Sequence, residues 1–511
     1  MYEYRGVYVK IGMDKRKALL NVTVSVGFKI LIMGIVIFAR RILIDTCGNE
    51  LNGLNALYIS IIGILSVAEL GVGSAITFCM YKPIVEGNNH QVSALYHLFR
   101  RIYLGIGMIV LVSGLLLTPF LKYFAKDYAL LDVNLHVTFL LMLVSVVISY
   151  FFGAKTALIN AYKNDYITNA IASGGLLLEH TLQIVVLLST GSFVWYLVCK
   201  IISIFLQWLL TSWIAHRKFH SIISDRQRVD QETKKTLIRS IKAMFMHKVG
   251  SLLVNSADSA IISIFIGVIV LGEYSNYVTI QSSMANVIVL IFSSLTSVFG
   301  HVYASQSKEI TRKYSEMFHL LNFIVGAVFY LGYYAVIDNL IALLFSPELI
   351  VSKSISFVIT LNGFVQFMRK STLTFRDATG AFYNDRWKPL AEGIMNIVLS
   401  VLLVQKIGVT GVIAATIITN LLLCHVIEPY VLYKNSFCAS PKKYYFKNYA
   451  MIALFVVQLL CLDQIMVCRH TQWEELLING SISVLISVIG CALIVLSDKE
   501  TRDFAKETFR K

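Results

Sequence analysis

A stripe of polar side chains runs through an apolar segment near the N-terminus, residues 18–39. Its members are Asn21, Ser25, Lys29 and, at the far end, Arg40. The spacings of 4, 4 and 11 residues place them on one face of a helix. A cation deep in an apolar segment must meet water, a partner or a ligand, because burying it alone costs several kcal/mol. Since lysine and arginine bind phosphate groups well, the stripe predicts a site for an anionic substrate.

A second stripe lies on the apolar segment 249–271 and consists of Lys248, Ser251, Asn255, Asp258, Ser259 and Ser263. We expect the two stripes to face each other as the walls of a water-filled, substrate-binding cavity. The alternative is that each stripe packs within its own half of the protein, where serine and asparagine form hydrogen bonds between helices.

Further ionisable groups in apolar segments are candidates for coupling or gating: Glu69, Glu179, His180, Arg376 and Glu392. For Glu69 and Glu392, a buried ion pair that fixes helix packing is an equally good interpretation. Arg376, with the nearby Arg369 and Lys370, lies toward the cytoplasmic end of its segment. Anchoring at the membrane surface is the simpler interpretation for these cations.

The composition indicates what surrounds these groups. Of 511 residues, 57% are hydrophobic and 15% are charged, and the mean hydropathy is +0.69. Ordinary soluble domains have about 25% charged residues. The chain therefore uses lipid as its solvent, which excludes soluble enzymes, nucleic-acid binders and disulfide scaffolds. The eight cysteines form no CxxC pair, so we expect neither a metal site nor a cofactor.

Fourteen apolar segments of helical length predict an all-α integral membrane protein. With the N-terminus in the cytoplasm, the cytoplasmic segments contain 34 of the 45 Lys and Arg residues, the outer connections seven, and the spans four. This asymmetry predicts a multi-pass plasma-membrane protein with both termini in the cytoplasm. The net charge of +15 therefore reflects topology.

An internal repeat divides the chain. Residues 160–166 and 380–386 share Ala, an aromatic residue and Asn-Asp at an offset of 220, and Asn55 and Asn276 are 221 apart. We therefore expect two pseudo-symmetric six-helix lobes and two additional helices. The predicted divisions are an N-terminal lobe, a cytoplasmic linker, a C-terminal lobe, and a final helix pair with its tail: 1–215, 216–247, 248–434 and 435–511.

Several motifs resemble those of the bacterial polysaccharide transporters, the Wzx-like branch of the multidrug/oligosaccharidyl-lipid/polysaccharide exporter superfamily. They are Glu69–Ala75 followed by Tyr81-Lys82-Pro83, Phe375–Gly380, Glu392 with Asn396, Gly408–Val412, and Glu428-Pro429-Tyr430 with Lys434. The resemblance covers roughly residues 15–435. It implies a two-lobed flippase without catalytic activity, whose substrate is an oligosaccharide linked through pyrophosphate to a polyprenol. It also implies that Lys29, and less firmly Lys248, contact the pyrophosphate.

The resemblance implies alternating access and a role in capsule, exopolysaccharide or O-antigen assembly. Membrane lipid surrounds the protein, and a polysaccharide polymerase and glycosyltransferases are candidate partners. One alternative is a cation-coupled multidrug exporter of the same fold, for which a more acidic or apolar cavity is expected. A membrane polymerase or glycosyltransferase of the same pathway is another, but the short outer connections disfavour it. No ATPase motif occurs, so an ion gradient, the membrane potential or product consumption must drive transport.

Overall fold

The computed structural model describes residues 15–69, 72–225, 229, 256–381, 387–467 and 473–510. Within these ranges, nothing is described of the side chains of 15–28, 67–68, 74–75, 287, 289–291, 293–294, 297 and 505–510. Every regular element in the described part of the chain is helical, as the all-α prediction required.

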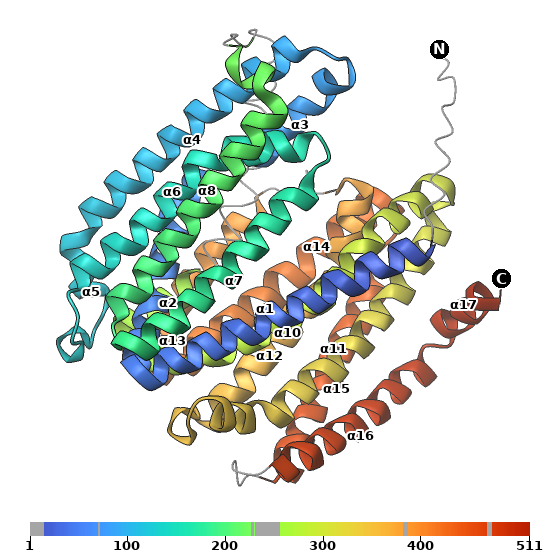
Figure 1. The fold of residues 1–511 in the computed structure, drawn as a ribbon. Helices are drawn as coiled ribbons and strands as arrows, with labels where there is room; N and C mark the ends of the chain where they lie inside the picture. The colour runs from blue at the N-terminus through green and yellow to red at the C-terminus, as the bar shows by residue number, and fades with distance from the viewer. Residues whose placement is uncertain are drawn as a thin grey trace.

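The first group of helices ends at residue 224 (Figure 1). Its members are α1 (Lys15–Cys47), α2 (Asn49–Leu65), η1 (Ser66–Glu69), α3 (Val72–Val85), α4 (Asn89–Leu117), η2 (Thr118–Phe120), α5 (Leu121–Phe124), η3 (Tyr128–Leu130), α6 (Leu135–Ala161), α7 (Asp165–Thr190) and α8 (Phe193–Ser224). Helix α8 thus includes the first nine residues of the expected linker 216–247, most of which lies outside the described residues.

The second group begins with the short helix Ser256–Phe265. It continues with α10 (Val268–Ser305), α11 (Lys308–Leu344), η4 (Pro347–Leu349), α12 (Lys353–Thr379), α13 (Lys388–Thr419), η6 (Asn420–Cys424), α14 (His425–Leu432), η7 (Tyr433–Phe437), α15 (Lys442–Ile465), α16 (Trp473–Ser497) and α17 (Lys499–Arg510). The elements η6 and η7 are π-helical turns, which often occur at functional sites.

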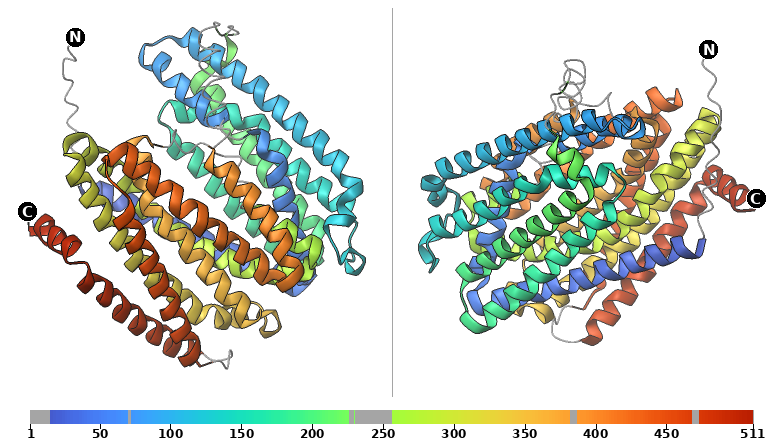
Figure 2. Two further views of the ribbon diagram at one scale, coloured as in Figure 1. Left: turned by 180° about the vertical axis from the view of Figure 1, so that it is seen from behind. Right: turned by 45° about the horizontal axis from the view of Figure 1, so that its top comes forward.

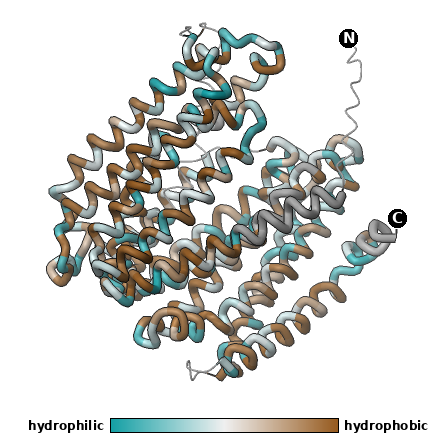
Figure 3. Tube along the Cα trace, viewed as in Figure 1, coloured by the Kyte–Doolittle hydropathy of each residue, from teal (hydrophilic) through white to brown (hydrophobic). Residues whose placement is uncertain are grey.

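Helix length and hydropathy agree with a membrane protein. Eight helices in the described part of the chain are long and apolar enough to cross a bilayer, which needs about 20 residues. Figure 3 shows hydrophobic residues along much of the helices. The expected number of fourteen spans is not confirmed, but the multi-pass helical architecture is.

Local signals explain where helices begin and end. The side chain of Asn88 accepts a hydrogen bond from the backbone of Gln91 at the start of α4, and Asn134 caps α6 in the same way. At the other end, α7 and α12 stop at Gly191 and Gly380, both left-handed.

Helix α13 contains a reversal of the chain at Gly408. This glycine has φ 60° and ψ −139°, a conformation that a side chain would strain. The amide of Asn396 donates to Thr416 Oγ1 at 2.7 Å, whereas twenty residues of straight helix would span about 30 Å. The two arms of α13 are therefore antiparallel, which explains why the sequence shows separate apolar segments at 388–405 and 410–432.

The two groups meet where α2 packs against α10, while α1 contacts α7, α2 and α10. Figures 1 and 2 show α3–α8 on one side and α11, α12, α15 and α16 on the other. Helices α15 and α16 lie at the edge of the second group, where α16 packs on α11. This arrangement leaves α10, α12 and α13 as the inner helices of the second group.

Candidate functional site

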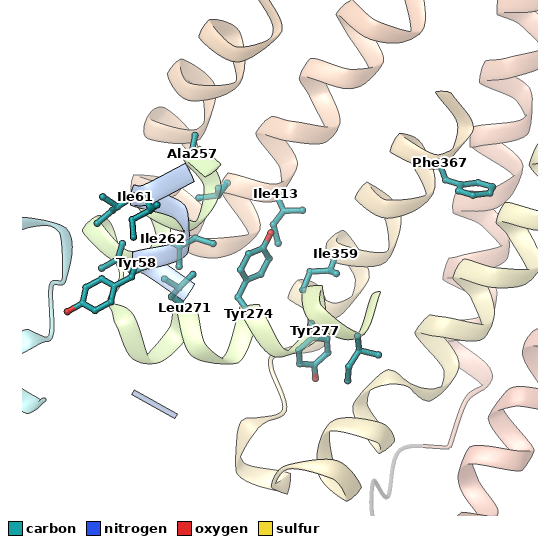
Figure 4. Packing of buried hydrophobic residues seen from close by; sticks show 14 of the residues in the cluster. Tyr58, Ile61, Ala257, Ile262, Leu271, Tyr274, Tyr277, Ile359, Phe367 and Ile413 are labelled. Carbon is teal, nitrogen blue, oxygen red and sulfur yellow. The ribbon is translucent and has the colours of Figure 1, made fainter. Parts of the chain in front are cut away.

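A cavity of about 510 Å³ lies among the inner helices of the second group. Its walls come from the helix Ser256–Phe265, α10, α11, α12, both arms of α13 and the π-turn η6. Figure 4 shows Tyr274, Ile359 and Ile413, which line it, projecting from three different elements. The cavity thus lies within the second half, whereas the sequence analysis placed the site between the two halves.

Uncharged polar side chains dominate the cavity wall. Five are amides: Gln281, Asn286, Asn362, Gln366 and Asn420. Gln281 donates to the Ile359 carbonyl at 3.2 Å, and Gln366 donates to Asn362 Oδ1 at 3.2 Å. The aromatic rings of Tyr274, Tyr330 and Phe367 form further parts of the wall. Amides and aromatic rings together suit a ligand rich in hydroxyl groups, because each amide both donates and accepts hydrogen bonds.

Arg369 is the most tightly held charge at the cavity. Its Nη2 and Nε donate to the two carboxylate oxygens of Glu428 at 2.6 and 3.2 Å. Its Nη1 donates to Asn420 Oδ1 at 2.6 Å and to Glu392 Oε1 at 3.1 Å. The guanidinium therefore joins α12 to both arms of the α13–α14 segment, in the bidentate geometry that arginine favours.

Lys388 completes a buried network of four charges. Its ammonium lies 2.6 Å from Glu428 Oε1 and 2.7 Å from Glu392 Oε2. Two cations and two anions thus balance each other, as buried charges must. Arg369 and Glu392 line the cavity, and Lys388 and Glu428 support them from behind.

Lys370 is the next residue along α12 and also lines the cavity. Within the described residues its ammonium has neither an ion pair nor a hydrogen bond. It is half-buried. An unpaired ammonium on a polar wall can bind an anionic group.

Asp258 forms the opposite charge on the wall, and its surroundings differ from those of Glu392. The carboxylate is 8% exposed and accepts a hydrogen bond from Thr416 at 3.1 Å, with no cation paired to it in the described residues. The Oδ1 of the neighbouring Asn396 is buried without a partner. A buried carboxylate without a cation is costly, so this place can hold a proton or a monovalent cation. The described residues contain no cluster of three His, Cys, Asp or Glu side chains suited to a metal.

Hydrogen bonds between the two groups of helices all lie at one end of the molecule in the described part of the chain. Arg40 donates to the Ser275 carbonyl at 2.7 Å and to Asn276 Oδ1 at 3.2 Å. Asn52 donates to Asn276 Oδ1 at 3.0 Å, and Asn49 donates to the Ile269 carbonyl at 3.1 Å.

Further bonds across this seam come from the α5 region and the end of α1. They include Ser263 to the Phe124 carbonyl at 2.6 Å, Lys126 to the Phe265 carbonyl at 3.0 Å, and Arg41 to the Leu343 carbonyl at 3.5 Å. The partners lie near the turns before α2 and α10, or at the ends of α5, α11 and helix Ser256–Phe265. These contacts therefore close one end of the protein.

The predicted site residues are distributed over the whole protein. Asp258 and Glu392 line the cavity. Arg40 instead lies at the seam, and Lys29 is exposed on α1, where it makes no ion pair with any described residue. Five side chains of the two predicted stripes lie outside those that the structure describes: Asn21, Ser25, Lys248, Ser251 and Asn255.

The other candidates also lie away from the cavity wall. Glu69 accepts a hydrogen bond from Tyr103 at 3.0 Å, so its described partner is a tyrosine, where the sequence suggested an ion pair. Glu179 is buried on α7, and the adjacent His180 bonds to Gln183 at 2.9 Å. Arg376 pairs with Asp377 at 3.1 Å near the end of α12.

A polar stripe on α12 is the feature that sequence reasoning did not single out. Asn362, Gln366 and Lys370 recur at spacings of four residues, which defines one helical face. The same periodicity identified the stripes on 18–39 and 249–271. The partners Lys388 and Glu428 could not be assigned in this way, because they lie on other helices.

No family model matches the chain, and no curated protein matches its sequence. Among solved structures it is similar to an inward-facing multidrug resistance MATE family transporter of the MOP superfamily, with 14% identity and a TM-score of 0.63 over 80% of this chain and 99% of that one. It is also similar to the lipid II flippase MurJ in an inward closed conformation, with 14% identity and a TM-score of 0.58 over 92% of this chain and 99% of that one. The chain therefore has the all-helical membrane fold that these structures share.

Proposed function

We propose that this protein is a flippase that moves an oligosaccharide, linked through pyrophosphate to a polyprenol, across the plasma membrane. The observation that carries the proposal is the cavity wall of amides and aromatic rings beside Arg369 and Lys370. The amides match sugar hydroxyls, and the cations match a phosphate group. The polyprenyl chain stays in the lipid, because the cavity is polar.

Alternating access supplies the mechanism. The N-terminus is proposed to lie in the cytoplasm, so the seam bonds of Arg40, Asn49 and Asn52 close the outer end. Substrate then enters from the cytoplasmic leaflet. Breaking the seam and closing the opposite end would release it outside. Lys29, exposed on α1, is proposed to contact the pyrophosphate during entry.

A cation-coupled multidrug exporter is the second candidate, and the similarity of the fold to that of a multidrug resistance transporter favours it. Asp258 provides the specific observation, since a buried carboxylate that pairs with no cation among the described residues suits coupling to a proton or a cation. The two candidates differ in what the cavity recognises. An organic cation would meet Lys370, which repels it, whereas an anionic glycolipid would be attracted.

Reconstitution into liposomes tests the proposal. A fluorescent lipid-linked oligosaccharide on a pyrophosphate is placed in both leaflets, and its loss from the outer leaflet is read with a membrane-impermeant quencher. We expect faster exchange with the protein than with empty liposomes, slower exchange for Lys29→Ala, and no transport of the cationic dye ethidium. Transport of ethidium without movement of the glycolipid would replace the flippase with the multidrug exporter.

A further inference from the structure

We propose that Arg369 and Lys370 form a pyrophosphate subsite in the cavity, and that Glu392 occupies this subsite as an internal counter-anion when no substrate is bound. This inference rests on the proposed function and specifies where the anionic part of the substrate is recognised. It places recognition on α12, within the second group of helices.

Lys370 is the open half of the subsite. Both residues line the same cavity, and the ammonium of Lys370 has no described partner. Buried ammonium groups are normally paired, because their desolvation is costly. A ligand anion in the cavity therefore gains a charge-assisted contact without first breaking one.

Arg369 is the exchangeable half. Glu428 holds Nε and Nη2 through two hydrogen bonds and is 1% exposed, so this side of the guanidinium is fixed. The other side presents Nη1 to Asn420 and to Glu392, which lines the cavity. The contact between Nη1 and Glu392 is the longer of the two, at 3.1 Å.

Glu392 can give up Arg369 without becoming an unpaired charge. Its other oxygen lies 2.7 Å from the ammonium of Lys388, which precedes it by one helical turn. A phosphate group that takes the place of Oε1 at Nη1 would thus leave the pair of Lys388 and Glu392 intact. Two adjacent cations, one open and one exchangeable, suit the two phosphates of a pyrophosphate better than a single carboxylate.

Binding of inorganic pyrophosphate to the full-length protein in detergent, measured by isothermal titration calorimetry, tests the role of Lys370. Lys370→Ala should weaken binding about tenfold, as expected for the loss of one charge-assisted contact. Lys370→Arg should retain most of the affinity. Lys406→Ala is the matched control, because Lys406 is exposed and does not line the cavity. Equal affinities for the wild type and Lys370→Ala would overturn the subsite.

The substitution Glu392→Gln tests whether Glu392 is the counter-anion, and it is expected to raise the affinity for pyrophosphate. Removing the competing carboxylate charge should strengthen pyrophosphate binding several-fold, because Nη1 then lacks its resting anion. If this variant does not fold, Glu392→Asp retracts the carboxylate from Arg369 and should strengthen binding in the same direction. Weaker or unchanged binding in a folded variant would contradict the exchange.

Farnesyl pyrophosphate as a second probe distinguishes a lipid-borne group from free pyrophosphate. We expect Lys370→Ala to weaken the binding of both probes. The wild type should bind farnesyl pyrophosphate more tightly than free pyrophosphate. Tighter binding of the free ion would exclude a lipid-borne ligand. The liposome assay separates the proposed function, which is flipping, from the pyrophosphate subsite. Pyrophosphate binding of the expected pattern without flipping would overturn the function and leave the subsite. Flipping by a protein whose pyrophosphate binding does not depend on Lys370 would overturn the subsite and leave the function.

Discussion

Gly53 on α2 and Gly272 on α10 occupy reciprocal places at the seam between the two groups of helices. A Cβ on Gly53 would lie 1.9 Å from the Val268 carbonyl oxygen, and one on Gly272 would lie 2.5 Å from the Asn49 carbonyl oxygen. Each glycine therefore faces the first residue of the other helix. The two glycines are 219 positions apart, and so are the two first residues, Asn49 and Val268. The missing side chains allow the two helix backbones to touch.

Gly53→Ala should therefore destabilise the protein by at least about 2 kcal/mol, since the new methyl group must displace backbone atoms. Thermal unfolding in detergent measures the effect. Gly105→Ala on α4 is the matched control, because its Cβ would meet nothing within 4 Å. It should leave stability unchanged or raise it slightly. Equal melting temperatures for both variants would contradict the close approach at the seam.

The bonds of Arg40 should hold the seam closed. Arg40→Ala removes two hydrogen bonds from a charged donor, each contributing about 1.5–3 kcal/mol. The closed end should then open in a larger fraction of molecules. Spin labels at the exposed positions Tyr123 and Glu348, in a cysteine-free background, report the separation as a distance distribution.

Arg41→Ala provides the control for this substitution. Arg41 is the adjacent residue, is exposed, and makes a longer hydrogen bond of 3.5 Å to the Leu343 carbonyl. Its removal should leave the distances near those of the wild type. If Arg40→Ala does not broaden the distance distribution, Arg40 does not hold the seam. The same follows if Arg41→Ala broadens the distribution as much.

Much of the fold could be predicted from hydrophobic periodicity. The segment 388–405 corresponds to the first arm of α13, and 410–432 to its second arm with η6 and α14, because Gly408 lies between two apolar runs. The exact register of the repeat could not be predicted. The sequence match of Asn55 with Asn276 has an offset of 221, whereas Gly53 and Gly272, which approach the partner backbones reciprocally, are 219 positions apart. Short sequence matches cannot resolve a difference of two residues.

The candidate site was predicted only in part. Asp258 and Glu392 were identified because charged residues in apolar segments are rare, and both line the cavity. The neutralisation of Arg369 by Glu428 was not predictable, because 59 residues separate the pair and only the chain reversal brings them together. Lys29 is predicted to contact the substrate from its depth in its segment; it is exposed on α1 and is not among the residues that line this cavity.

Asp258 should determine how the protein responds to ions. If the carboxylate binds a monovalent cation or a proton, replacing choline chloride with sodium chloride, or lowering the pH, should raise the melting temperature of the wild type. Asp258→Asn should abolish that response. Asp377→Asn, which removes an exposed carboxylate at the end of α12, should preserve it. A response that survives Asp258→Asn would assign it to another group.

The C-terminal helix α17 should be held by an acid-sensitive contact. Asp498 lies beyond α16, where burial raises its pKa, but hydrogen bonds from Lys447, at 2.7 Å, and Thr501 outweigh burial and hold it below the ordinary value. Since the folded-state pKa is depressed, this stabilisation is present above the ordinary carboxyl pKa and is lost as the pH falls through the lower one.

Asp498→Asn imitates the protonated state at neutral pH. Hydrogen exchange in α17 should become faster in this variant, because Lys447 loses its shorter ion pair and keeps only the one with Glu316 at 3.9 Å. Exchange in the distant helix α7 should stay the same and serves as the internal control. Unchanged protection of α17 would mean that other contacts hold it, such as the pair of Lys443 and Glu500 or the edge-to-face contact of Phe504 with Tyr314.

Transport through the cavity in the second group of helices is the central claim, and a cavity-filling variant tests it most directly. Ala285 lines the cavity on α10, so Ala285→Trp should fill part of it, whereas Leu402→Trp adds the same ring on an exposed part of α13. The measurement is the initial rate at which reconstituted protein moves the fluorescent lipid-linked oligosaccharide between leaflets. We expect Ala285→Trp to fall below about a tenth of the wild-type rate, equivalent to more than about 1.4 kcal/mol, and Leu402→Trp to retain it. Wild-type transport by a folded Ala285→Trp protein would contradict the account.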